Sequence, residues 1–252
     1  MTPAQRIAEL VAVARSIVTY HGDPAKAAQM DRLYAGFVGP GSLAFDIGSH
    51  VGDRVASFRR LGASVVALEP QPGPARVIET LFGDDPDVTL VRAACGATEG
   101  MLVFKVNSDN PTVSTASADF IASAAGAGGW EGQVWDREIE VAATTLDRLI
   151  RDHGVPAFVK IDVEGFEADV LAGLTQALPA LSFEFTTIQR GVALACLDRL
   201  AALGRYGFDV ALGESQHMTF GRLVSKDEMA AHLSGLPHQA NSGDVYAVLS
   251  GE

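Results

Sequence analysis

Basic residues and cysteines are scarce in this chain of 252 residues. There are 19 Lys and Arg residues against 31 Asp and Glu residues, so the formal net charge is −12. No run of Lys and Arg is present. A general nucleic-acid binder is therefore not expected, because neutralising phosphates requires basic residues in excess. Two cysteines, Cys95 and Cys196, are too few for a disulfide framework or a four-cysteine zinc site.

Long apolar runs are also missing, although hydrophobic residues make up 48% of the sequence. Charges interrupt every stretch before it reaches the roughly 18 apolar residues that a membrane span needs. The first ten residues include Arg6 and Glu9 and lack the apolar segment of a signal peptide. A chain this apolar, with only 20% charged residues, is not disordered. We expect a cytoplasmic globular protein without a membrane partner; the sequence leaves its oligomeric state open.

Seven short apolar runs alternate with helical stretches and predict an α/β fold with a parallel sheet. Near-continuous apolar strands between helices are typical of a sheet covered on both faces, and right-handed crossovers make it doubly wound. The last run follows a polar turn at residues 241–243, so we expect it to return as an antiparallel edge strand. The runs are Leu43–Ile47, Ser64–Leu68, Val88–Ala93, Ala157–Ile161, Ala180–Phe185, Phe208–Leu212 and Asp244–Leu249.

Helical spacing of apolar residues predicts two helices before the first strand, at residues 4–18 and 24–37. They form either a cap over a binding site or a plain packing pair. Later helices are expected at residues 53–61, 74–82, 167–178 and 192–206, and a short one begins at the capping box of Ser225 and ends near Leu233.

Residues 100–143 break the alternation of strands and helices. Two stretches with a strand pattern, Gly100–Val106 and Arg137–Ala142, enclose a polar, Gly-rich stretch that contains two tryptophans. Long irregular loops inside compact domains are uncommon and often functional. We expect an inserted β pair that carries a mobile substrate loop at residues 107–136; the alternative is a disordered excursion. The chain then forms one domain, with helices at 1–39, a core at 42–99 and 144–252, and this insertion.

The segment Asp46-Ile47-Gly48-Ser49-His50-Val51-Gly52 follows the first strand and opens a helix. Gly48 permits a turn that a Cβ atom would block, and Gly52 permits a close approach of helix, strand or ligand. The helix N-terminus offers free N–H groups to an anionic ligand group. Neither GxGxxG nor GxxxxGK[ST] is present. Glu69 ends the second strand about 20 residues after Gly48, where an acid can accept both hydroxyls of a ribose. These features favour a nucleoside cofactor.

Two acids, Asp162 and Glu164, follow the strand that we expect to be central. Ligands bind at such strand ends in open α/β sheets. Alternate residues of an extended chain share a face, so the two carboxylates are expected on the same side. The alternative is that one of them only caps the helix that begins near Phe166.

These motifs resemble the FkbM family of S-adenosylmethionine-dependent methyltransferases. The resemblance covers about residues 43–185 and implies a class I methyltransferase fold, which is Rossmann-like, with seven mostly parallel strands and an antiparallel last strand. It also implies methyl transfer to a hydroxyl oxygen of a small molecule such as a sugar or natural product. His50 stands where the family motif has Asn. The matching residues are Asp46-Ile47-Gly48 with Gly52, Glu69-Pro70, Thr145-Leu146-Asp147 and the run Lys160–Glu167.

The resemblance implies that Asp162 and Glu164 face the methyl group and the acceptor, and that Glu69 holds the ribose. The adenine would lie near Ala94 and Cys95. The remaining cofactor positions are at the turn after the first strand and beside Glu69: Asp46, Gly48, Ser49, His50, Gly52 and Pro70.

An alcohol is a weak nucleophile and benefits from a general base. The candidate catalytic acids are Asp162, Glu164 and Glu184, which lies near the end of the next strand; His50 is a fourth candidate base. Hard cations prefer carboxylates, but the pair Asp162 and Glu184 lacks a clear third ligand, so no metal is expected. Two alternative functions stay open, a non-catalytic binding protein with a cofactor fold and a nicotinamide-dependent oxidoreductase.

Overall fold

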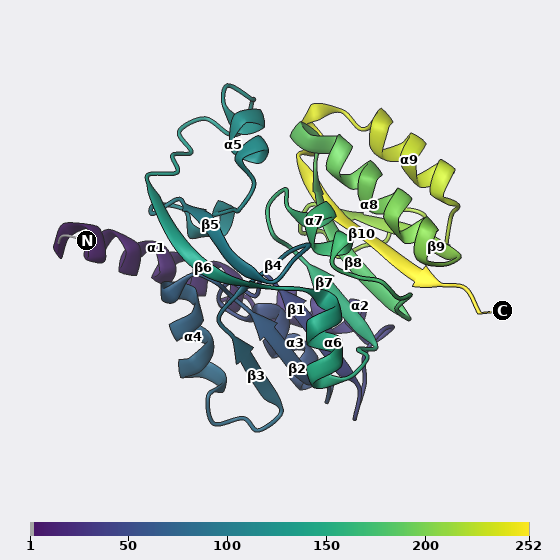
Figure 1. The fold of residues 1–252 in the computed structure, drawn as a ribbon, viewed down its shortest axis with the longest axis horizontal. Coiled ribbons are helices and arrows are strands. Elements are labelled where there is room, and N and C mark those ends of the chain that lie inside the picture. Colours follow the sequence, from purple (N-terminus) through teal and green to yellow (C-terminus); the bar gives the residue numbers. More distant parts are fainter. Residues whose placement is uncertain (1–2, 252) are drawn as a thin grey trace.

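The computed structural model describes residues 3–251, and a seven-stranded sheet forms its centre (Figure 1). The strand order is β3-β2-β1-β7-β8-β10-β9. Only the pairs of β10 with β8 and with β9 are antiparallel in this sheet, which confirms the mostly parallel α/β fold with an antiparallel last strand. The strands are β1 (Leu43–Ile47), β2 (Ser64–Leu68), β3 (Val88–Val91), β7 (Phe158–Ile161), β8 (Ala180–Thr186), β9 (Tyr206–Leu212) and β10 (Ser242–Leu249).

The expectation that the last strand lies at the edge of the sheet is wrong. β10 lies between β8 and β9 and pairs with both, so β9 is the edge strand. The side chains of Val245, Tyr246 and Ala247 are all buried, as in a strand covered on both faces. The apolar run alone predicts such a strand but not its neighbours.

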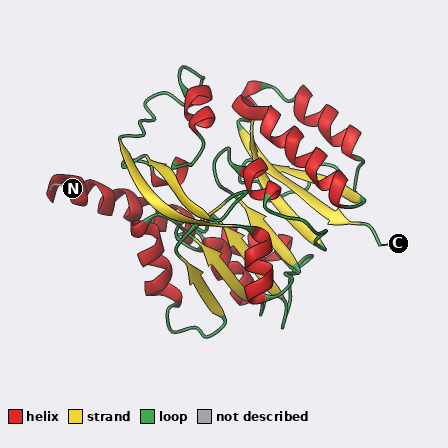
Figure 2. Cartoon of the chain, viewed as in Figure 1, coloured by secondary structure: helices red, strands yellow, loops and turns green. Residues whose placement is uncertain are grey.

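Helices cover both faces of the sheet (Figure 2). Alternate strand residues face opposite ways: Phe45 and Ile47 pack in the cluster with α6 to α9, whereas Ala44 packs with α2 and α3. The helices of the core are α2 (Pro24–Tyr34), α3 (Asp53–Arg60), α4 (Pro72–Phe82), α6 (Leu146–His153), α7 (Glu167–Ala172), α8 (Arg190–Leu203) and α9 (Lys226–Gly235).

Several helices end earlier than expected: α2 at Tyr34 rather than residue 37, α8 at Leu203 rather than residue 206, and α7 at Ala172 rather than residue 178. The residue after α7, Gly173, lies against another segment, where a Cβ would be 2.3 Å from the Gly96 carbonyl oxygen. α6 was not expected from the sequence. Thr145 caps it by accepting a hydrogen bond from the Arg148 N–H at 3.1 Å. The predicted cap at Ser225 is present in the same form at the start of α9.

The insertion contributes two strands, β5 (Gly100–Val106) and β6 (Arg137–Thr144), to a second sheet in the order β4-β6-β5, whose third strand β4 (Ala94–Cys95) precedes it. The expected β pair is therefore present. The segment between its strands is not simply irregular, however, because it contains η1 (Pro111–Val113) and α5 (Ala118–Ala124). A small apolar cluster of its own, with Phe120 and Trp130 in edge contact at 5.1 Å, orders this segment.

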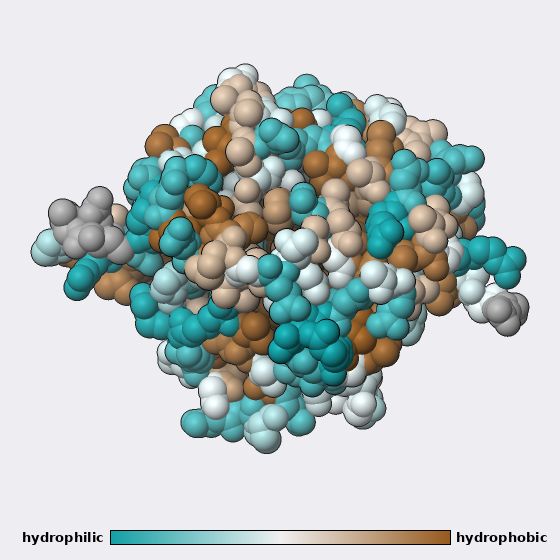
Figure 3. Space-filling model, in the orientation of Figure 1, coloured by the Kyte–Doolittle hydropathy of each residue, from teal (hydrophilic) through white to brown (hydrophobic). Residues whose placement is uncertain are grey.

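Helix α1 (Pro3–His21) extends away from the body at its N-terminal end (Figure 1). Its C-terminal end lies over the carboxyl edge of the sheet, where Tyr20 contacts the His50 ring at 5.8 Å. The cap interpretation therefore fits the last turn of α1, while α2 packs on α3. No helix among residues 3–251 is long and apolar enough to span a membrane. Hydrophilic and hydrophobic residues are interspersed on the face shown in Figure 3.

Candidate active site

Gly48 joins the carboxyl ends of β1, β2 and β7. Its φ is +88°, and a Cβ at this position would lie 1.8 Å from the Asp162 carbonyl oxygen. Its N–H donates to the Leu68 carbonyl at 3.0 Å, and the Asp162 N–H donates to the Ile47 carbonyl at 2.9 Å. Only glycine fits this contact, so the turn holds Asp162 beside the first strand.

Glu69 is buried at the end of β2, on the wall of a cavity that also contacts Gly48 and Asp162. Its two carboxylate oxygens accept backbone hydrogen bonds from His50, at 2.9 Å, and from Gln71, at 2.7 Å. Burial raises the pKa of Glu69 to about 8, although both backbone hydrogen bonds act to lower it. Each oxygen retains a lone pair with which to accept a ribose hydroxyl.

The same cavity is lined by other expected cofactor residues. His50, Pro70, Ala94 and Cys95 line it together with Phe166, which the sequence analysis did not select. Burial raises the pKa of the Cys95 thiol to about 12, so this thiol is neutral and serves as apolar wall. The cavity is thus lined both by the acidic ribose candidate Glu69 and by small apolar residues. We call it the cofactor cavity.

Gly52 does not line this cavity. Its φ is +81°, and its missing side chain faces α4, where a Cβ would meet the Phe82 ring at 3.0 Å and Ile78 at 3.3 Å. The resemblance implied a cofactor contact for Gly52, but its missing side chain makes room for packing against α4.

A second cavity of about 210 Å³ adjoins the first and is strongly polar. Asp46 and Ser49 line this second cavity rather than the cofactor cavity. Burial raises the pKa of Asp46 to about 7, and its Oδ2 is buried without a hydrogen-bond partner. We call this space the polar cavity. The residues that line both cavities are Gly48, His50, Thr112, Asp162 and Glu164.

The three candidate acids meet in the polar cavity. Asp162 follows β7, Glu164 lies in the loop after it, and Glu184 is in β8. Burial raises the pKa of Glu164 and of Glu184 well above the usual range, and the neighbouring acids add to both shifts. Burial also acts to raise the pKa of Asp162, but Lys160 and Arg54 outweigh it and the net shift is downward.

Lys160 is buried within β7 and explains the low pKa of Asp162. Its ammonium donates to Asp162 Oδ2 at 3.0 Å and to Asp244 Oδ1 at 2.8 Å. The second partner, Asp244 on β10, comes from a distant part of the chain that no local pattern links to Lys160. Asp162 is thereby held ionised next to the cofactor cavity.

The loop after β7 is fixed by Glu167, whose Oε1 accepts hydrogen bonds from the Val163 N–H at 3.1 Å and the Gly165 N–H at 3.2 Å. Glu164 adopts φ +56°, which a non-glycine residue rarely does. The Thr115 hydroxyl of the insertion donates to its carbonyl at 2.7 Å. The insertion therefore helps to hold Glu164 in place.

His50 lies between the two cavities, with Nε2 at 3.5 Å from the Thr112 hydroxyl. Burial lowers the pKa of His50 to about 4, so the ring is neutral at pH 7. Its Nδ1 is buried without a hydrogen-bond partner. A neutral imidazole in this place is able to accept a proton or to donate a hydrogen bond.

Sequence reasoning missed several residues of the polar cavity, because no local motif marks them. Tyr20 comes from α1, Arg54 from α3, Trp130 from the insertion and Asn241 from the turn before β10. Of these, only Trp130 had a sequence signal for a role in the site, because it is an aromatic residue in a polar stretch. The carboxyl edge of the sheet brings these separate segments together.

The fold, the turn at Gly48 and the acids at the strand ends define a protein of the class I methyltransferase type. Comparison with known families identifies it further: the methyltransferase FkbM domain matches residues 46–210, well over half of the chain. The chain belongs to the FkbM family of S-adenosylmethionine-dependent methyltransferases, and S-adenosylmethionine is its cofactor. The resemblance noted in the sequence is thereby confirmed, and a nicotinamide-dependent oxidoreductase finds no support.

A curated relative is the hexuronic acid methyltransferase AglP of Haloferax volcanii, 25% identical over 184 residues, which are 71% of this chain and 70% of the relative. Two solved structures are similar. The Bacillus cereus O-methyltransferase in complex with SAH has a TM-score of 0.47 and 12% identity over 99% of this chain and 92% of its own. A TehB-like SAM-dependent methyltransferase from Corynebacterium glutamicum has a TM-score of 0.49 and 11% identity over 99% and 100%. At these TM-scores the structures add nothing to the assignment.

Proposed function

We propose that this methyltransferase transfers its methyl group to a hydroxyl oxygen of a small polyhydroxylated molecule such as a sugar or natural product. One observation carries the proposal: the cofactor cavity and the polar cavity share Gly48, His50, Asp162 and Glu164. A cofactor in the first and an acceptor in the second would therefore meet at these residues. The polar cavity offers carboxylates, an amide, hydroxyls and Trp130, which suit a ligand with several hydroxyl groups. The relative AglP, which acts on a hexuronic acid by its name, is consistent with this class.

In this proposal Glu69 accepts the ribose hydroxyls and Asp162 orients the cofactor near its methyl group. Glu164 or Glu184 removes the proton of the acceptor hydroxyl as its oxygen attacks. The O–CH3 bond forms while the S–CH3 bond breaks in line, and S-adenosylhomocysteine leaves. Positioning supplies most of the rate enhancement in such a displacement.

The test is turnover with S-adenosylmethionine and a panel of sugars, uronic acids and phenols, followed by mass spectrometry of the products. Either product carries one added methyl group. A methyl ether survives mild alkali, whereas a methyl ester on a uronic acid is hydrolysed. Transfer to carboxyl groups alone would contradict the proposal. Glu69→Gln tests the cofactor assignment: its amide nitrogen cannot accept a backbone N–H hydrogen bond as a Glu69 carboxyl oxygen does. We expect S-adenosylhomocysteine binding to weaken by about 1–3 kcal/mol.

We further propose that the chain works as one domain, in the cytoplasm, on a small molecule rather than on nucleic acid. The net charge of −12 supports the last point. Both cysteines are free and buried thiols, as in a reducing compartment.

A further inference from the structure

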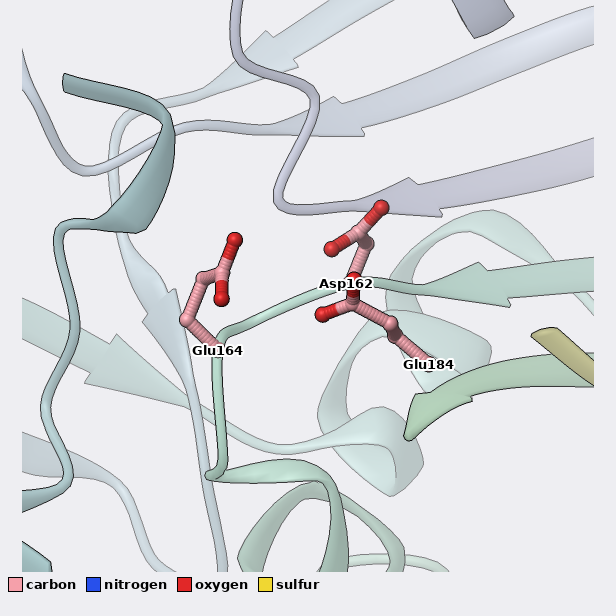
Figure 4. A group of neighbouring side chains, drawn as sticks. All are labelled: Asp162, Glu164 and Glu184. Atoms are coloured by element: carbon pink, nitrogen blue, oxygen red, sulfur yellow. The ribbon is translucent and has the colours of Figure 1, made fainter. Parts of the chain in front are cut away.

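Three carboxylates, two from the loop after β7 and one from β8, lie close together. One carboxylate oxygen each of Asp162, Glu164 and Glu184 lies within 4.8 Å of the other two. Figure 4 shows the Glu164 carboxylate facing Asp162 and Glu184 across a gap. The sequence analysis expected no metal because the pair Asp162 and Glu184 lacked a third ligand. The turn after β7 supplies that ligand in Glu164.

The neighbouring cations form an ion pair with only one member of this cluster, Asp162. Lys160 directs its ammonium to Asp162, to Asp244 and, at 3.5 Å, to the Ile161 carbonyl, which uses its three N–H donors. The Arg54 guanidinium pairs with Asp53 at 2.6 Å and with Glu214 at 3.3 Å. Within residues 3–251, Glu164 and Glu184 have no ion pair. Buried carboxylates without a counter-charge are strongly unfavourable.

Polar groups without hydrogen-bond partners surround the gap. They indicate a ligand there independently of the clustering of the three acids. Glu164 is only 7% exposed, and within residues 3–251 no hydrogen bond reaches its carboxylate, while Glu184 Oε2 is buried without a partner. Across the same cavity, Trp130 is 8% exposed and its indole Nε1–H also lacks an acceptor. Asp46, 1% exposed, adds a third unpartnered oxygen. A cation on the acids, with a ligand oxygen beside it for the indole, satisfies both kinds of group.

We propose that Asp162, Glu164 and Glu184 bind one divalent cation, Mg²⁺, Mn²⁺ or Ca²⁺, at the boundary of the two cavities. All three ligands are hard oxygens, which these ions prefer. Metal–oxygen distances of about 2.1 Å for Mg²⁺ and 2.3–2.6 Å for Ca²⁺ place the ligand oxygens of one ion roughly 3–5 Å apart. The three oxygens here all lie within 4.8 Å of one another, as such an ion requires. The remaining coordination positions face the polar cavity and are open to water or to acceptor oxygens.

The role of the cation, though not its binding, rests on the proposed function. An acceptor hydroxyl on the cation loses its proton more readily. With Glu164 and Glu184 as ligands, the neutral ring of His50, which lines the same cavity, takes that proton in their place. The acceptor would also be fixed in the line of attack, next to Asp162. A vicinal diol, with two oxygens for the open positions, fits this arrangement best.

Cation binding is measurable without turnover. Mn²⁺ is titrated into the full chain, with and without S-adenosylhomocysteine, and free Mn²⁺ is followed by electron paramagnetic resonance; calorimetry with Mg²⁺ and Ca²⁺ accompanies it. We expect one site, and Glu164→Gln and Glu184→Gln should each weaken Mn²⁺ binding at least about tenfold. Glu214→Gln is the matched control, because Glu214 lines the same cavity but stands outside the cluster, and its affinity should stay within about twofold.

Absence of Mn²⁺ binding at millimolar concentration, or equal binding by Glu164→Gln, Glu184→Gln and the native chain, overturns the inference. Circular dichroism establishes that each variant is folded, and either of the two glutamine variants suffices if the other does not fold. The S-adenosylhomocysteine titration and the product assay report on the proposed function separately. Cofactor binding with methyl ether formation but no cation site would leave the proposed function standing and remove the cation alone.

Discussion

Replacing Gly48 by alanine tests whether the contact between β1 and β7 builds the site. Two costs act together at this position. The first is the left-handed backbone, φ +88°, which costs a residue with a Cβ about 1–2 kcal/mol. The second is steric, since the new Cβ would lie 1.8 Å from the Asp162 carbonyl oxygen, whereas real Cβ atoms essentially never come within 3.0 Å. One of the two strands must move by more than an ångström, and overpacking of this kind costs about 1–3 kcal/mol or more.

Gly41→Ala separates the two costs. Gly41 has φ +78°, but nothing lies within 4 Å of a Cβ built there. We expect Gly41→Ala to lower the free energy of unfolding by about 1–2 kcal/mol and Gly48→Ala by about 3–5 kcal/mol. The measurement is urea unfolding with the slope m compared between variants, so that a change in the midpoint reports stability.

Cofactor affinity is the second measurement on the same pair. Gly48→Ala displaces Asp162, so S-adenosylhomocysteine should bind at least about tenfold more weakly, roughly 1.4 kcal/mol. Gly41→Ala lies away from the cofactor cavity and should bind as the native chain does. Equal losses of stability for the two variants, or unchanged affinity for Gly48→Ala, would refute the reasoning that this close approach positions the site.

Three further predictions concern pH, the acids and the insertion. The folded pKa values of Asp46 and Glu69 are raised to about 7 and 8, so their stabilising contribution is complete below pH 4 and is lost as the pH rises toward 8. Urea unfolding should give a lower free energy of unfolding at pH 8 than at pH 5.5. The double variant Asp46→Asn/Glu69→Gln should show a smaller difference between the two pH values. Glu164→Gln should lower turnover about 10²–10⁴-fold with S-adenosylhomocysteine affinity nearly unchanged; a loss of only a few-fold would leave Glu184 or His50 as the base. Hydrogen exchange across residues 107–136 should slow when an acceptor binds, because lids exclude water, and unchanged protection would contradict a lid.

The strands and most helices were predictable because their apolar residues recur at the spacing of the face that is buried. β1 and β2 begin and end where the apolar runs do. The strand order was not predictable. The sequence of β10 predicts an apolar strand at any place in the sheet, and its position between β8 and β9 depends on pairing that no local pattern encodes. α6 was missed because Thr145 was considered only within a motif and not as a cap.

The site was predictable where a backbone constraint forces a residue type. Gly48 must be glycine, and Glu69 stands at a strand end, so both were found from the sequence. Trp130 and Tyr20 reach the polar cavity from the insertion and from α1, and their positions depend on tertiary packing. Gly52 was assigned to the cofactor, yet its lack of a side chain serves the contact with Phe82. A glycine motif therefore indicates close approach but does not say which neighbour approaches.

The acids show how a correct expectation can have the wrong cause. Asp162 and Glu164 were expected on one side because alternate residues of an extended strand share a face. The strand, however, ends at Ile161, and Glu164 turns into the left-handed region at φ +56°. The carboxylates nevertheless converge, because Gly165 continues the turn and Glu167 holds it by two backbone hydrogen bonds. The sequence Asp-Val-Glu-Gly-Phe-Glu thus encodes a clamped turn rather than a strand end. That turn brings Glu164 opposite Glu184 and gives the cluster the third carboxylate that spacing alone did not reveal.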